Sequence, residues 1–126
     1  MSDSRIKVGK IGEALAIEHF KAQGYEIRAQ NYRTRSGEID LIVQRGKRIA
    51  FVEVKTRRSS KFGLPQAAVT PAKQKQISKI ALNYLQVHNL LDVPCQFDVV
   101  AIMLSWKFEL IRLQHIENAF AFCTDG

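Results

Sequence analysis

Asp40, Glu53 and Lys55 are the residues of this chain whose types and spacing could support hydrolysis at a metal ion. Mg²⁺ keeps several waters and needs only one or two carboxylates besides substrate phosphate oxygens. Asp40 and Glu53 can supply these two carboxylates to Mg²⁺ or Mn²⁺. A bound ion of this kind activates water and stabilises developing charge. Lys55 could position or help deprotonate the attacking water, or place a positive charge beside the transition state. The three residues therefore predict metal-dependent hydrolysis of a phosphodiester.

Two neighbouring strands must bring these side chains together. If the chain turns at Arg45-Gly46, Gln44 faces Lys47, so that Asp40 lies opposite Phe51 and diagonal to Glu53. Side chains alternate across a strand, so Glu53 and Lys55 share a face. A slip of one residue in the register would send the aspartate to the opposite face, whereas a two- or four-residue loop keeps it on this one.

Glu13 and Gln74 are candidate site residues on two helices. Glu13 heads an otherwise apolar stripe of a helix expected over residues 7–23, so it either borders the metal site or reaches solvent near the helix start. A second helix, expected from Pro71 to about His88 with Thr70 as its N-cap, carries Lys73 and Gln74 in its first turns. Both could face the sheet edge and bind a phosphate at the helix N-terminus, or they could face water.

The remaining pattern predicts an α/β fold. Strands are expected at residues 25–32, 38–44, 48–56, 95–103 and 108–113, and a short closing helix at 116–122. A strand, a crossover helix and another strand imply parallel pairing. We predict one domain over residues 1–126, with a mixed sheet flanked by helices in the order α-β-β-β-α-β-β. Its predicted core comprises Ile17, Phe20, Ile39, Leu41, Val52, Val54, Ile77, Ile80, Ala81, Tyr84, Val99 and Ala101.

The charge is strongly positive and uneven. The net charge is +7 and the pI about 9.7; residues 1–80 hold 17 Lys/Arg against 7 Asp/Glu, and residues 81–126 hold 2 against 5. A basic field over the candidate site would attract a polyanion such as nucleic acid, although it could also be a solvated surface. The predicted phosphate contacts are Arg33, Arg35, Arg57, Arg58, Lys61 and Lys73.

Several classes of protein are disfavoured. No run approaches the roughly 18 apolar residues of a membrane span, and the N-terminus lacks a signal peptide, so we expect a soluble cytoplasmic protein without membrane contact. Cys95 and Cys123 are too few for a disulfide framework. The chain has no phosphate-binding loop of the P-loop type. His19, His88 and His115 lack ligand spacing, and we assign no function to them.

The chain also resembles a known family. The matching segments are Gly-Glu-Ile-Asp40-Leu-Ile, Phe-Val-Glu53-Val-Lys55-Thr-Arg, Ala-Val-Thr-Pro-Ala-Lys73-Gln74 and Phe-Asp98-Val-Val. They resemble the YraN family of small bacterial proteins, which is similar to the PD-(D/E)XK nuclease superfamily and in particular to archaeal-type Holliday junction resolvases. The resemblance implies a restriction-endonuclease-like fold, and a dimer, because resolvases act on two-fold symmetric substrates.

Carried over position by position, the superfamily's first motif acid falls on Asp40, its second acid on Glu53 and its lysine on Lys55. Its helical acid falls on Glu13 and its helix-borne polar residue on Gln74. Ile39 stands where the superfamily name has proline. We therefore expect a metal-dependent endonuclease that cleaves DNA, including branched or structured DNA. The alternatives are a non-catalytic nucleic-acid-binding module on a nuclease scaffold, and a protein-interaction adaptor supported only by the uneven charge.

Overall fold

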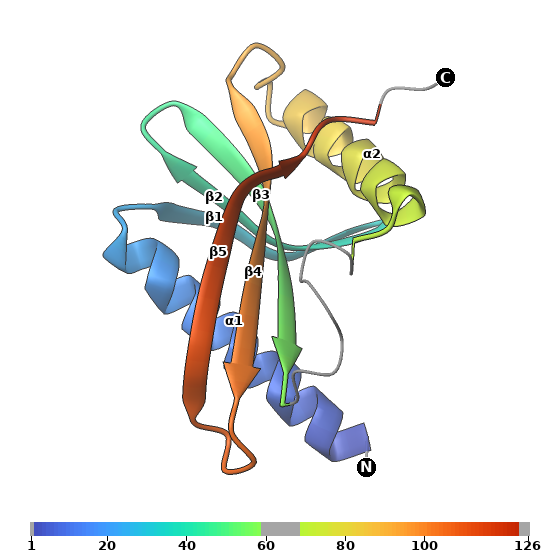
Figure 1. Cartoon of the computed structure of the whole chain (residues 1–126). Helices are drawn as coiled ribbons and strands as arrows, with labels where there is room; N and C mark the ends of the chain where they lie inside the picture. Colours follow the sequence, from blue (N-terminus) through green and yellow to red (C-terminus); the bar gives the residue numbers. More distant parts are fainter. Residues whose placement is uncertain (1, 59–68, 124–126) are drawn as a thin grey trace.

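A five-stranded mixed sheet lies between two helices in the computed structural model, which describes residues 2–58 and 69–123 (Figure 1). The elements follow in the order α-β-β-β-α-β-β, as the sequence predicts. The helices are α1 (Ser2–Ala22) and α2 (Pro71–Val87), and the strands are β1 (Glu26–Thr34), β2 (Gly37–Arg45), β3 (Arg48–Arg57), β4 (Cys95–Leu104) and β5 (Leu110–Phe120). Neither helix is long and apolar enough to cross a membrane, among the residues described.

The strands lie in the sheet in chain order, β1-β2-β3-β4-β5. β3 and β4 are parallel, and the other neighbouring pairs are antiparallel. The parallel pair is the one whose connection includes α2, which confirms the predicted crossover. Thr70 caps α2 as expected, because its side chain accepts a hydrogen bond from the Lys73 backbone amide. The α/β fold class is therefore confirmed.

Each face of the sheet carries its own hydrophobic core, because successive side chains of β3 point to opposite faces. Phe51 belongs to the core under α2, which includes Ile77 and Tyr84. Val52 belongs to the core under α1, which includes Phe20. Most predicted core residues are buried, but Ile17, Val54 and Ala101 are partly exposed.

The C-terminal helix expected at 116–122 is wrong. Residues 110–120 form β5, which pairs with β4 from Leu104↔Leu110 to Phe97↔Phe120. This one strand covers both the strand expected at 108–113 and the helix expected at 116–122. Backbone pairing along most of β4 outweighs the helical preference of residues 116–122, because a segment this short has only a weak preference. The other boundaries differ by a few residues, the largest difference being α1, which begins at Ser2 rather than Lys7.

A glycine lets α1 approach β3 closely. The helical position of Gly12 is buried, and a Cβ placed there would collide with the side chain of Thr56. Gly9, one turn earlier, has no such neighbour within 4 Å. The contact sets α1 against the C-terminal half of β3, and the residue after Gly12 is the candidate Glu13.

Candidate functional site

The β2–β3 hairpin sets the position of Asp40 relative to Glu53. Arg45 pairs with Arg48, so the two-residue turn is Gly46-Lys47 rather than Arg45-Gly46. Asp40 is therefore not opposite Phe51, and the predicted register is wrong by two residues. A shift of two keeps every side chain on its predicted face. Asp40 and Glu53 become the next residues on their strands after the last pair, Leu41 with Val52.

At that point β2 and β3 separate. β2 continues to pair with β1 as far as Gly37, and β3 continues to pair with β4 as far as Arg57, whereas the described β2–β3 ladder stops at Leu41↔Val52. The result is a fork between two strands that each keep their other neighbour. Backbone groups that face the fork need another partner.

Asp40 supplies that partner. Its Oδ2 accepts a hydrogen bond of 2.8 Å from the backbone N–H of Val54. The bond aims the carboxylate across the fork at the strand that carries the other two candidates. Burial raises the pKa of Asp40 above its ordinary value, while the hydrogen bond from Val54 and the positive charge of Lys55 act in the opposite direction.

Glu53 and Lys55 project on the same side of β3. The Glu53 side chain is 5% exposed and its Oε2 lies 3.9 Å from Nζ of Lys55. Its other oxygen, Oε1, is buried and has no hydrogen-bond partner among the residues described. Burial and then the negative charge of Asp40 raise the pKa of Glu53 to about 7. A buried carboxylate with an unsatisfied oxygen beside a second carboxylate fits a divalent cation, whose charge would compensate both.

Glu13 reaches the same fork from α1. Burial and then the charge of Asp40 raise the pKa of Glu13, so the two carboxylates lie within electrostatic range. Nδ2 of Asn31 on β1 donates to Oε1 of Glu13 at 3.4 Å. Of the two readings of the sequence, the structure therefore favours a Glu13 that borders the candidate site.

α2 contributes Lys73 at its first turn. Lys73 is partly buried, and its positive charge lowers the pKa of both Asp40 and Glu53, against the larger effect of burial. Gln74 uses its side-chain amide to donate to the backbone carbonyl of Val69 at 3.0 Å. This hydrogen bond joins the first turn of α2 to the residue that precedes its N-cap. The catalytic role predicted for Gln74 stays a prediction.

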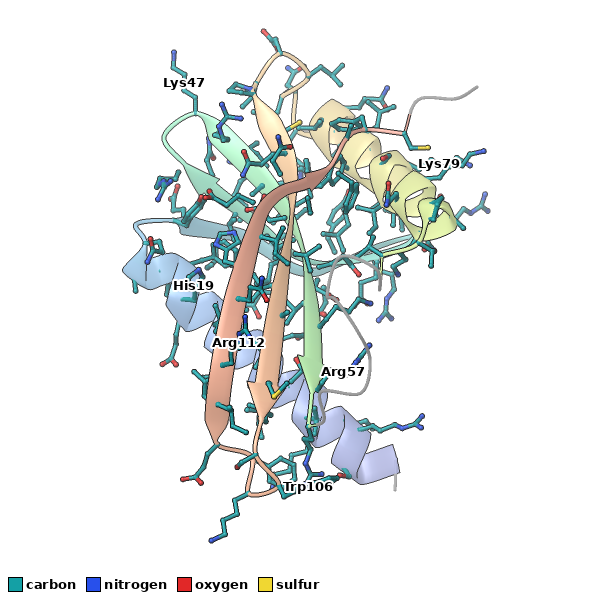
Figure 2. The ribbon with its side chains drawn as sticks, in the orientation of Figure 1. His19, Lys47, Arg57, Lys79, Trp106 and Arg112 are labelled. Carbon is teal, nitrogen blue, oxygen red and sulfur yellow. The ribbon has the colours of Figure 1, made fainter. Side chains whose placement is uncertain are left out.

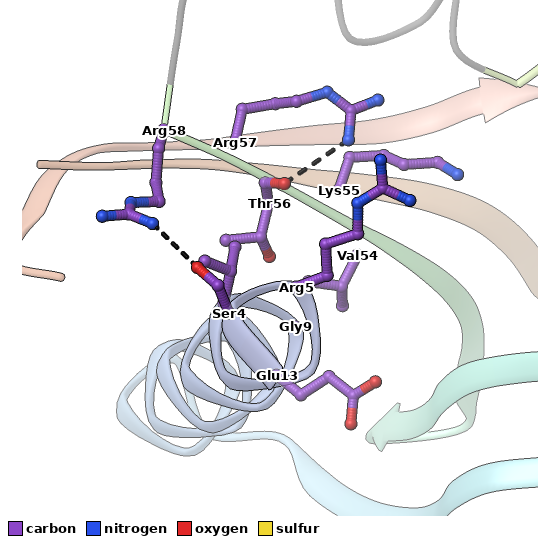
Figure 3. A pocket seen from close by; sticks show the side chains of 10 residues that line it. Ser4, Arg5, Gly9, Glu13, Val54, Lys55, Thr56, Arg57 and Arg58 are labelled. Carbon is purple, nitrogen blue, oxygen red and sulfur yellow. Dashed lines mark hydrogen bonds between the residues drawn. The ribbon is translucent and has the colours of Figure 1, made fainter. Parts of the chain in front are cut away.

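A pocket of about 630 Å³ opens beside Lys55 and Glu13, between α1 and the end of β3 (Figure 3). Arg5 and Glu13 project from α1 on the side on which Lys55 projects from β3. The lining is mostly polar and carries four cationic side chains: Arg5, Lys55, Arg57 and Arg58. Such a lining suits an anion that extends away from the carboxylates.

The predicted phosphate-binding residues fall into distinct groups. Arg33 forms an ion pair with Glu38 at 2.7 Å although its side chain is 78% exposed, and Arg35 is exposed in the β1–β2 turn. Arg57 is half-buried, and its guanidinium Nη1 donates to the Thr56 carbonyl at 3.4 Å. Lys61 lies outside the described residues.

Arg58 is engaged within the fold. Its guanidinium donates to Oγ of Ser4 at 3.1 Å and to the carbonyl of Trp106 at 2.7 Å. It also lies over the rings of Trp106 and Phe108, at 4.5 and 4.3 Å from their centroids. These contacts tie α1 to the β4–β5 turn, so Arg58 has a structural role besides lining the pocket.

A second polar cluster, missed by the sequence reasoning, lies on the α1 side of the sheet. Nε2 of His115 is 2.8 Å from Oδ2 of Asp98, and Nδ1 of His115 is 3.0 Å from Nε2 of His19. Asp98, His115 and Glu117 offer ligand atoms within 4.8 Å of one another and could hold a metal ion. The histidines are 96 residues apart, so spacing gave no signal. The only signal was Asp98 inside an apolar strand.

The chain is similar to proteins from several bacteria. It is 51% identical over 115 residues to a UPF0102 protein of Syntrophus aciditrophicus, covering 91% of this chain and 89% of the relative. It is 50% identical over 113 residues to one from Geotalea uraniireducens, covering 90% and 88%. With one from Geobacter metallireducens it shares 45% over 120 residues, covering 95% and 97%. The sequence profile of the uncharacterised protein family UPF0102 matches residues 12–102, and the chain belongs to that family.

Proposed function

We propose that this chain is a divalent-metal-dependent endonuclease of the PD-(D/E)XK type, which hydrolyses phosphodiester bonds in DNA. The observation that carries the proposal is the fork between β2 and β3. There Asp40 bonds to the backbone of β3 beside Glu53, whose buried Oε1 has no partner in the described part of the chain. A buried carboxylate next to a partly buried one, each with a raised pKa, is poorly explained by packing and well explained by a bound cation.

Asp40 and Glu53 would hold the ion, Mg²⁺ or Mn²⁺, which supplies charge neutralisation and an activated water. Lys55 keeps its ammonium 3.9 Å from Glu53, where it can donate to a phosphate oxygen or orient the water. Glu13 adds a third acid beside Asp40, and burial and the charge of Asp40 raise its pKa. Lys73 approaches the carboxylates from α2 with a further positive charge.

The DNA backbone would lie across the basic surface around this fork. Arg5 and Lys55 line the pocket beside the carboxylates, and Arg33 and Arg35 lie near the end of the β1–β2 hairpin. That hairpin end contacts α2, because the Gln76 amide donates to the Ser36 carbonyl. These cationic side chains, in the pocket and at the hairpin end, can position phosphates without reading sequence. Branched or structured DNA, and a dimer that cleaves it, are the finer parts of this proposal.

The test uses purified full-length protein with four-way-junction, single-stranded and duplex DNA, in Mg²⁺ or Mn²⁺. Asp40→Asn and Lys55→Met should each lower the cleavage rate by about 10² to 10⁴-fold, while the variants still bind DNA. Lys47→Met is the matched control, because Lys47 projects from the β2–β3 turn at the far end of the hairpin from the fork (Figure 2). It should cleave as the wild type does.

The proposal fails if no DNA is cleaved in either metal, or if Asp40→Asn cleaves as fast as Lys47→Met. Binding that falls steeply with salt but is indifferent to divalent ions and to Asp40→Asn would identify a binding module on a nuclease scaffold instead.

A further inference from the structure

Asp98 is a fully buried carboxylate on β4 and does not line the pocket beside Glu13. Its described partners are the Gln96 amide at 2.9 Å, the backbone N–H of Asn118 at 3.0 Å and the His115 ring at 2.8 Å. No lysine or arginine pairs with it in the described part of the chain. The cluster therefore places a carboxylate oxygen and an imidazole nitrogen, both of them metal-ligand atoms, 2.8 Å apart with no cationic side chain from lysine or arginine between them.

β5 is distorted where it passes Asp98. The pairs Phe97↔Phe120 and Val99↔Ile116 leave residues 117–119 of β5 against Asp98 alone on β4. Asn118, at the centre of this bulge, has a φ of 52°, an unusual conformation for a residue other than glycine. The bulge turns the Asn118 N–H onto Asp98 and brings the exposed Glu117 to the same place. Bulges of this kind redirect side chains at functional sites.

His115 is oriented from both sides of its ring. Nδ1 is hydrogen-bonded to Nε2 of His19 on α1, while Nε2 faces Asp98. The ring also meets Phe20 edge-on, with centroids 4.9 Å apart. A histidine that binds a metal usually has its second nitrogen held by a hydrogen bond, which fixes the ring and its tautomer. His19, on the side away from Asp98, provides that second contact.

We propose that Asp98, His115 and Glu117 bind one divalent transition-metal ion of the zinc type. One imidazole nitrogen and two carboxylate oxygens form a donor set that suits Zn²⁺, which takes three protein ligands and leaves a fourth position for water. His115 Nε2 and Asp98 Oδ2 would exchange their mutual hydrogen bond for bonds of about 2.0–2.2 Å to the ion. Glu117 is exposed, and its carboxylate oxygen already lies within 4.8 Å of the other two ligand atoms. The ion joins the edge strand β5 to β4 and, through His19, to α1, independently of the proposed nuclease site.

The experiment uses full-length protein that carries Asp40→Asn, so that the carboxylate pair of the fork does not contribute. Calorimetric titration with Zn²⁺ should show one equivalent of binding, and Co²⁺ should give the visible absorption of a four- or five-coordinate site. Adding Glu117→Gln should weaken Zn²⁺ binding by at least about 10-fold, and adding His19→Gln by about 10-fold. Glu26→Gln, an exposed glutamate at the start of β1, is the matched control and should change nothing.

At the same concentration, Zn²⁺ should also raise the unfolding temperature of the Asp40→Asn protein by more than that of the Asp40→Asn, Glu117→Gln protein. Glu117 is on the surface, so its substitution leaves the buried Asp98–His115 contact in place. The proposal is overturned if the Asp40→Asn protein binds no Zn²⁺, or if Glu117→Gln and Glu26→Gln bind it equally. Either result would leave the cluster as a hydrogen-bond network.

Discussion

Replacing Glu53 with glutamine should stabilise the metal-free protein at neutral and alkaline pH. Burial and the charge of Asp40 raise the pKa of Glu53 from 4.5 to about 7, so the folded protein binds a proton there that the unfolded chain has already lost. Because the folded state holds more protons between these two values, its stability falls as pH rises through that window. Glutamine has nearly the same shape as protonated glutamate and carries no charge at any pH.

The magnitude follows from the size of the shift. A change in the pKa of Glu53 from 4.5 to about 7 lowers the free energy of unfolding by up to about 3 kcal/mol. This destabilisation is fully present above pH 7 and absent below pH 4.5. Glu53→Gln should therefore raise the free energy of unfolding by up to about 3 kcal/mol at pH 8 in EDTA, and by almost nothing at pH 4. Glu26→Gln, at an exposed position, should stay within about 0.5 kcal/mol at both pH values.

Chemical denaturation at pH 4 and pH 8 measures both differences, with EDTA or Mn²⁺ present at pH 8. A cation that binds only the folded protein at 100 times its dissociation constant stabilises it by about 2.7 kcal/mol. Wild type should show such a gain with Mn²⁺, and Glu53→Gln should show a smaller one, because it lacks one carboxylate ligand. The second ion site proposed on β4 and β5 is common to both proteins.

A destabilising charge on Glu53 is refuted if Glu53→Gln is less stable than the wild type at pH 8 in EDTA. It is also refuted if the difference between the two proteins is the same at pH 4 and pH 8. The first result would mean that the carboxylate is stabilised by partners inside the fold, and the second that its charge is not what costs stability.

Two further predictions concern the scaffold and the basic surface. Gly12→Ala should lower the free energy of unfolding by about 1–3 kcal/mol, because the added Cβ collides with Thr56. Gly9→Ala in the same helix should raise it by about 1 kcal/mol, because the position is open and alanine favours a helix. Thermal unfolding measures both, and a Gly12→Ala protein that is stabilised like Gly9→Ala would contradict the close α1–β3 contact. Arg58→Ala should lower the free energy of unfolding by about 1–2 kcal/mol through its lost ring contacts, and Arg35→Ala should change it by almost nothing. Arg35→Ala should lower the salt dependence of DNA binding by about one ion. Equal stabilities of these two variants would show that Arg58 does not tie the turn to α1.

Local pattern was sufficient for the placement of most elements and for one half of the candidate site. The strict alternation of β3 requires Glu53 and Lys55 to share a face whatever the strand pairs with. The Thr70-Pro71 start of α2 was also readable, because N-capping depends on adjacent residues. By contrast, the hairpin register was misread by two residues, since either of two neighbouring dipeptides could form the turn. The error left Asp40 on the correct face only because the displacement was even.

What the amino-acid order determined by itself was therefore the type and order of the helices and strands up to the middle of β5, the side chains that share each face and the excess of positive charge. These depend on periodicity and composition over a few residues. Only the tertiary structure decided where β2 leaves β3, which lets Asp40 bond to Val54. It likewise decided that β5 bulges at Asn118 and that His19 meets His115. Contacts of this kind join residues far apart in the chain. Their geometry is set by strand register and helix packing, and these cannot be inferred from the spacing of residues within a short segment.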